Sequence, residues 1–127
     1  MNLVAYLRSS MQEDVGEQDM EEQERGIAEY CKQRGYNLTE VVTDESIQSS
    51  TERHGLDHAL ETTADGIIVT DPLVITDKYE DLDHFFEKLA QHRKKLIVVY
   101  ENKQFDPLAA ANVKADFHEA YPHLLRD

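Results

Sequence analysis

Residues 66–70 read Gly-Ile-Ile-Val-Thr, and Asp71 and Pro72 end this run. Three β-branched apolar residues in a row, without polar alternation, are typical of a strand buried on both faces of a parallel sheet. Other apolar runs that indicate strands occur at residues 3–7, 37–43 and 95–100. The sequence therefore predicts four strands, and the run at residues 66–70 favours a mostly parallel sheet.

Amphipathic stretches separate these runs and predict helices. The strongest spans residues 79–93, where Leu82, Phe85, Phe86 and Leu89 lie at helical spacing on one face. Further helices are expected at residues 17–34, 56–63 and 107–121. The alternation of strands and helices predicts a single three-layer α/β domain. Its sheet is mostly parallel, with four to five strands and helices on both faces.

The charge balance of the 127-residue chain excludes some classes of protein. Its 13 Lys and Arg residues stand against 26 Asp and Glu residues, which gives a formal net charge of −13. A general nucleic-acid or anionic-membrane surface must be positive, so the charge argues against both, although a small local basic site stays open. The length predicts one domain over residues 1–127, with no separate DNA-binding domain.

Other patterns bear on compartment and bound groups. Cys31 is the single cysteine, no apolar run is long enough to span a bilayer, and no signal peptide is visible. We therefore expect a cytoplasmic protein with no membrane partner. His54 and His58 could share a helix face as zinc ligands, but solvated surface histidines are the favoured interpretation because Cys-x-x-Cys is absent. Nucleotide-binding glycine motifs are also absent, so we expect no metal and no cofactor.

Ligands of parallel sheets bind beyond the carboxyl ends of the strands, so the polar residues there are the first candidates for a site. Arg8, Ser9 and Ser10 follow the first run. Arg8 and Ser10 point to the same side of an extended strand. An arginine suits phosphate, and a serine becomes a nucleophile beside a base or cations. On these residues alone, a polar loop with Arg8 in a salt bridge is the favoured interpretation.

A second candidate stretch is residues 44–55, where Arg53 follows acidic and hydroxyl-bearing residues. The alternative is a helix start capped by Ser50 or Thr51, with Arg53 exposed.

Together the two stretches resemble the N-terminal catalytic domain of the serine recombinases, the resolvase/invertase family. The family's first strand ends in Tyr-x-Arg-x-Ser, and the matching residues are Tyr6, Arg8 and Ser10. Its first helix often reads Gln-x-x-x-Ile-x-x-Tyr-Cys-x-x-x-Gly-Tyr, matched by Gln23, Ile27, Tyr30, Cys31, Gly35 and Tyr36. The Asp-rich turn and Arg-x-Gly-Leu that follow are matched by Asp44, Glu45, Arg53, Gly55 and Leu56. The likeness covers about residues 2–100.

This resemblance implies a phosphoryl transfer without metal or cofactor. The family's serine attacks a DNA phosphodiester and forms a 5′-phosphoserine link, and Ser10 takes that nucleophile position. Arg8 and Arg53 take two positions that bind the scissile phosphate. Gln23 takes a polar position beside them.

The stretch after the third strand departs from the family's pattern. The family carries Asp-Arg-Leu-x-Arg there, which aligns with residues 73–77. Leu73 replaces the aspartate, Val74 the first arginine and Asp77 the second. Losing one group that stabilises transition-state charge costs ~10²–10³ in rate, so losing two beside a carboxylate costs ~10⁴–10⁶. The apolar residues Leu73, Val74 and Ile75 either form an exposed patch for a protein partner or pack down over the site.

These departures favour a stand-alone, degenerate resolvase-like domain, catalytically impaired and acting as a regulatory or protein-interaction module in DNA recombination. We expect a protein partner or a homodimer, and only weak contact with DNA. The main alternative is an active recombinase that uses Ser10. Weaker alternatives are a DNA mimic and a phospho-receiver with Asp71 and Lys103, although Arg8 to Ser10 stand where a receiver needs an acidic pair.

Overall fold

The computed structural model describes residues 1–8, 16–44, 54–71, 74–75, 79–100 and 102–106. Within these residues the chain forms a five-stranded sheet in the order β2-β1-β3-β4-β5. The strands are β1 (Asn2–Arg8), β2 (Asn37–Asp44), β3 (Gly66–Val69), β4 (Lys95–Val98) and β5 (Lys103–Phe105). The helices are α1 (Gly16–Arg34), α2 (His54–Glu61) and α3 (Tyr79–Gln91).

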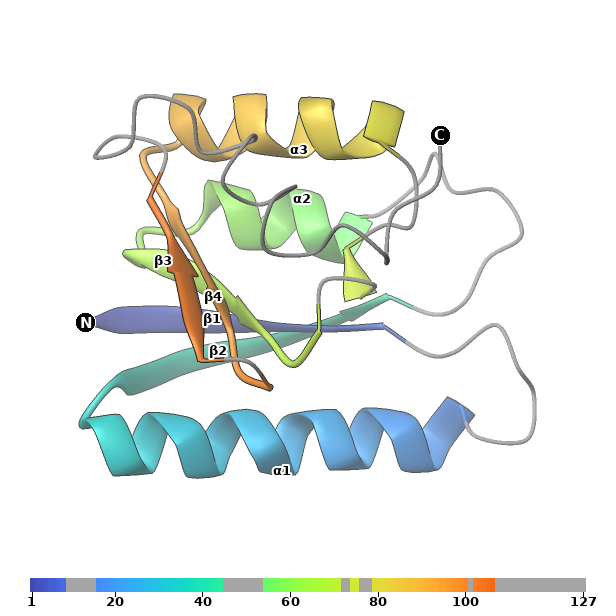
Figure 1. Ribbon diagram of the computed structural model, residues 1–127, viewed down its shortest axis with the longest axis vertical. Coiled ribbons are helices and arrows are strands. Elements are labelled where there is room, and N and C mark those ends of the chain that lie inside the picture. The colour runs from blue at the N-terminus through green and yellow to red at the C-terminus, as the bar shows by residue number, and fades with distance from the viewer. Residues whose placement is uncertain (9–15, 45–53, 72–73, 76–78, 101, 107–127) are drawn as a thin grey trace.

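All but one of the strand pairs are parallel. β1 pairs with β2 and β3, and β3 pairs with β4, whereas β5 runs antiparallel to β4. Helix α1 lies along one face of the sheet, and α2 and α3 lie along the other (Figure 1). The prediction of a three-layer α/β domain is confirmed. In the described part of the chain, no helix has the length and apolar character needed to cross a membrane.

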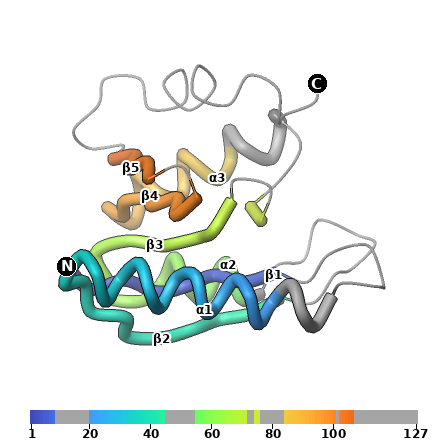
Figure 2. The backbone as a smooth tube through the Cα atoms, turned by 60° about the horizontal axis from the view of Figure 1, so that its bottom comes forward, coloured from blue at the N-terminus to red at the C-terminus, as the bar shows by residue number. Residues whose placement is uncertain are grey.

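Each face of the sheet builds its own apolar core. Toward α1 the core contains Leu3, Ala5, Leu7, Ile27, Cys31, Ile68 and Ile97. Toward α2 and α3 it contains residues such as Val4, Tyr6, Leu60, Ile67, Val69, Phe86 and Leu89. Figure 2 shows β1 and β3 inside the sheet, which is why both strands are apolar along their whole inner length. The dense run at residues 66–70 is thus the buried parallel strand that the sequence predicts.

The sequence did not indicate β5. It is only three residues long, and two of them are exposed polar residues, so it has no apolar run to mark it. The turn before it begins after Val98, which makes β4 shorter than expected. Asn102 N donates to Val99 O over 3.0 Å, and its φ of 52° lies in the left-handed region that Asn adopts more readily than most residues. The helix expected at residues 107–121 lies outside the described residues.

The turn between β4 and β5 is tied to α1. The Oδ1 atom of Asn102 accepts hydrogen bonds from Tyr30 Oη and Arg34 Nη2, each over 2.6 Å. The Arg34 guanidinium also lies 4.9 Å from the centre of the Tyr30 ring, a cation–π contact. These contacts hold the second half of α1 against the last hairpin of the sheet.

A buried lysine joins the ends of two helices at the amino edge of the sheet. Lys94 is 2% exposed and follows α3, and its Nζ donates to Thr62 O over 2.6 Å and to Ala64 O over 2.7 Å. Both carbonyls belong to the connection from α2 to β3. Burial lowers the pKa of Lys94 from its ordinary value of 10.5, and the charge of Asp65 opposes that shift.

The lowered pKa of Lys94 predicts a pH-dependent contribution to stability. Between its pKa in the folded protein and 10.5, the unfolded chain binds the proton more tightly than the folded one. The free energy of unfolding should therefore rise with pH across that window through this residue. Urea unfolding of the wild type and of Lys94→Met at a series of alkaline pH values gives the difference between the two proteins. A difference that stays constant across the window would contradict the prediction.

Candidate functional site

The carboxyl ends of β1, β2 and β3 meet at one edge of the sheet. Arg8, the last residue of β1, is the register partner of Asp44, the last residue of β2. Thr70 and Asp71 follow β3 at the same edge. Topology thus brings together two stretches that the sequence analysis singled out separately.

The carboxylate of Asp44 accepts hydrogen bonds from two other elements at this edge. Its Oδ2 atom accepts a hydrogen bond from the hydroxyl of Tyr6 over 2.8 Å, and Tyr6 is completely buried. Its Oδ1 atom accepts from Gly55 N over 2.8 Å, and Oδ2 accepts a second bond from Leu56 N over 3.1 Å. The carboxylate therefore caps the first turn of α2 and complements the positive end of the helix dipole.

Gly55 leaves the room that this cap needs. A Cβ atom at Gly55 would lie 2.8 Å from Thr43 O and 2.9 Å from Asp44 Oδ1. The Gly of the Arg-x-Gly-Leu motif is thus explained by close approach of α2 to the end of β2. In the sequence, Asp44 was recognised only as part of a turn that matches the family. Its capping role was not predicted, because residue spacing does not show which backbone N–H groups a carboxylate reaches.

Gln23 comes to the same edge from α1. Its side chain is 3% exposed, and its amide contacts the main chain of Arg8. Oε1 accepts from Arg8 N over 3.3 Å, and Nε2 donates to Arg8 O over 3.0 Å. The structure therefore brings Gln23 and Arg8, two of the predicted site residues, into direct contact.

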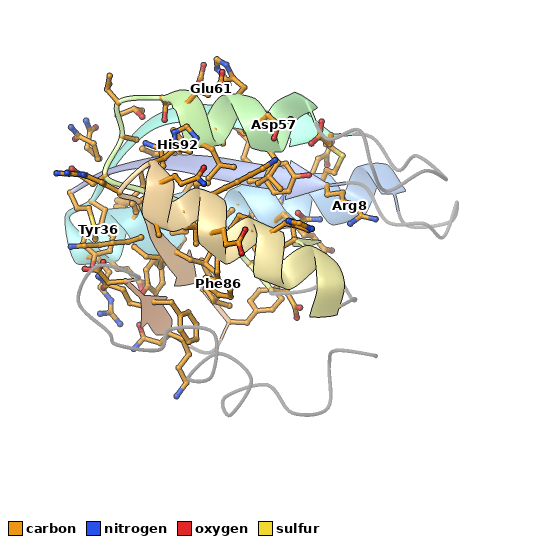
Figure 3. All side chains as sticks on the ribbon, turned by 90° about the horizontal axis from the view of Figure 1, so that it is seen from above. Arg8, Tyr36, Asp57, Glu61, Phe86 and His92 are labelled. Atoms are coloured by element: carbon orange, nitrogen blue, oxygen red, sulfur yellow. The ribbon has the colours of Figure 1, made fainter. Side chains whose placement is uncertain are left out.

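The Arg8 side chain is half-buried at the end of β1. Figure 3 shows it at the opposite end of the molecule from Tyr36. Among the described residues, the ion pairs are His58–Glu40 and Lys88–Asp57, so the salt bridge considered for Arg8 is not formed there. Ser10 and Arg53, the other predicted site residues, lie outside the described residues.

The residues described after β3 pack into the molecule and do not form the exposed apolar patch that was one of the two alternatives. Ile75 is 1% exposed and belongs to the core toward α2 and α3. Val74 is half-buried, packs against the same core, and its N–H donates to Asp71 O over 3.1 Å. Residues 74–75 therefore pack down into the molecule: Ile75 keeps the apolar character of the family's Leu, and Val74 places an apolar side chain where the family has its first arginine. Leu73 and Asp77 lie outside the described residues.

Of the two histidines considered as zinc ligands, the structure describes the side chain of His58. His58 Nε2 lies 3.0 Å from Glu40 Oε2, as an exposed pair between α2 and β2. The side chain of His54 lies outside the described set. No group of three or more His, Cys, Asp or Glu side chains gathers at metal-binding distance among the described residues.

Comparison with known families agrees with this geometry. The sequence model for the N-terminal domain of resolvases matches residues 3–126. The chain belongs to the resolvase family. It is therefore a resolvase-like domain related to site-specific recombination. A search of curated proteins finds no significant match.

Solved structures of other recombinases share the resolvase fold. The C-terminal catalytic domain of ISC1926 TnpA, an IS607-like serine recombinase, is 24% identical with a TM-score of 0.67, over 79% of this chain and 71% of that one. The N-terminal catalytic domain of TP901-1 integrase is 16% identical with a TM-score of 0.66, over 98% of both chains. A resolvase family site-specific recombinase from Streptococcus pneumoniae is 14% identical with a TM-score of 0.73, over 96% and 89%.

Proposed function

We propose that this resolvase-family domain is catalytically impaired and acts as a regulatory or protein-interaction module in site-specific DNA recombination. The observation that carries the proposal is the path of the chain after β3. Val74 aligns with the family's first arginine in this segment, and it packs against the core beside the buried Ile75. Residues 66–77 contain no Arg or Lys, so this segment has no cation for a phosphate.

The expected loss of rate is large. Each preorganised cation or donor at developing charge is worth ~10²–10³ in rate, and two are missing from the segment. Asp77 adds a negative charge to the same stretch of sequence, where the family has its second arginine. A combined loss of ~10⁴–10⁶ would leave strand cleavage too slow for efficient recombination.

The proposed partner is a protein, either another recombinase-like domain or a second copy of this chain. The formal net charge of −13 opposes close contact with DNA over a wide surface. It does not oppose a protein partner in the same way, because a protein interface depends on the complementarity of the two contacting patches, whereas DNA is negatively charged along its whole length. We propose the cytoplasm as its location.

An active recombinase is the second candidate, and Arg8 favours it. Its guanidinium has no ion-pair partner among the described residues, and it sits two positions before Ser10 in the sequence. In this alternative, Ser10 attacks the DNA phosphate while Arg8 and Arg53 bind it.

One experiment separates the two candidates. The full chain is incubated at low salt with a nicked DNA substrate that traps the serine–DNA link, and covalent adducts are resolved on a denaturing gel. We expect the wild type to give no more adduct than Ser10→Ala, because the missing cations leave the transition state unstabilised. Ser9→Ala is the matched control. An adduct that forms in the wild type and in Ser9→Ala but vanishes in Ser10→Ala would reject impairment and support the active enzyme.

A further inference from the structure

The amide of Gln23 faces the main chain of Arg8. It accepts from the N–H of Arg8 and donates to the C=O of the same residue, over 3.3 and 3.0 Å. A primary amide can do both at once, because it carries an acceptor and a donor side by side. In this way α1 supplies hydrogen-bond partners to both main-chain polar groups of the last residue of β1.

From this contact we infer that Gln23 is a positioning residue that acts on a bound anion through Arg8. Its side chain is 3% exposed, and both ends of its amide contact the Arg8 main chain. These two bonds orient the amide toward the main chain of Arg8, so a change at Gln23 acts first on the position of Arg8. The inference rests on the proposed site in one respect, namely that Arg8 is an anion ligand there.

The chemistry of the contact makes glutamate the informative replacement. In the Gln23→Glu variant, an ionised carboxylate would turn two acceptors toward Arg8 and repel its carbonyl oxygen. The protonated carboxyl group carries one acceptor and one O–H donor, and so reproduces the amide. Burial raises the pKa of a carboxyl group, so the protonated form is accessible at mildly acidic pH. A positioning role therefore predicts a Gln23→Glu protein that is defective at neutral pH and recovers as the pH falls.

The test follows Arg8 by NMR in the full-length, ¹⁵N-labelled chain. We expect hydrogen exchange at the Arg8 amide to be about 10-fold faster in Gln23→Glu than in wild type at neutral pH, the equivalent of one lost hydrogen bond. The ratio should return toward one at acidic pH. Gln33→Glu is the matched control, since it makes the same chemical change at an exposed position of the same helix. Equal exchange in Gln23→Glu and wild type at neutral pH, or an equal effect of Gln33→Glu, would overturn the inference.

A second measurement tests whether Arg8 binds an anion and whether Gln23 affects that binding. Sulfate is titrated into each protein, and the Arg8 side-chain Nε–Hε signal is followed. We expect sulfate to shift this signal in the wild type, and Gln23→Glu to need at least about threefold more sulfate at neutral pH but not at acidic pH. A wild-type Arg8 signal that sulfate leaves unmoved would overturn the positioning role. Formation of a serine–DNA adduct would reject impairment but leave this inference standing, so the two failures are distinguishable.

Discussion

Replacement of Asp44 by alanine is expected to lower the free energy of unfolding by about 3 kcal/mol. Two losses add up to this value. The first turn of α2 loses the carboxylate that accepts from Gly55 N and Leu56 N. The buried hydroxyl of Tyr6 loses the acceptor that lies 2.8 Å away. Urea unfolding followed by circular dichroism gives the change.

Two further variants separate these losses. Asp44→Asn keeps one side-chain oxygen and is expected to retain part of the cap. Tyr6→Phe removes only the hydroxyl, and in its background Asp44→Ala should cost less than in the wild type, because no unpaired phenol is left behind. An Asp44→Ala protein within about 0.5 kcal/mol of the wild type would show that this contact does not hold the edge together.

Replacement of Ile75 by alanine is expected to lower the free energy of unfolding by about 2–5 kcal/mol, the range for a buried large-to-small change. Ile75 is 1% exposed and packs in the same core as Tyr6 and Phe86. An exposed residue in a partner-binding patch would instead cost less than about 0.5 kcal/mol. Denaturant unfolding of the variant therefore distinguishes a buried anchor from a docking patch.

Val74→Ala is the matched control for this measurement. Val74 is the neighbour of Ile75 but is only half-buried, so its truncation should cost clearly less. Equal costs at the two positions, or a negligible cost at Ile75, would mean that the segment is not held as described. The proposed impairment would then lose its main support.

The sequence was informative wherever burial on both faces dictated composition. The apolar runs of β1 and β3 mark inner parallel strands, and the stripe of α3 marks its buried face through Phe85, Phe86 and Leu89. Strand β5 carries too few apolar residues to leave such a mark. The burial of Ile75 could not be predicted from the sequence, because a single isoleucine is compatible with a surface patch and with a core. Only the fold distinguishes the two.

The candidate site was predictable in its residues but not in its bonds. Arg8 and Gln23 were named from the sequence, yet their contact joins residues 15 positions apart through two different elements. The Tyr6–Asp44 bond joins residues 38 positions apart, and no periodicity reports such a pairing. Hydrogen bonds of this kind follow from the packing of α1 and α2 on the sheet, which local sequence does not encode.

The position of β1 between β2 and β3 affects how long its apolar side chains stay exposed during synthesis. β1 is translated before both of its partners, since β2 ends at Asp44 and β3 at Val69. At roughly 5–20 residues per second, several seconds pass between the emergence of β1 and the completion of β3. Until β3 is complete, β1 lacks one of its two neighbouring strands. Its apolar side chains are then accessible to chaperones or to other nascent chains. The apolar side chains of β1 therefore reach their final burial only after β3 has been made.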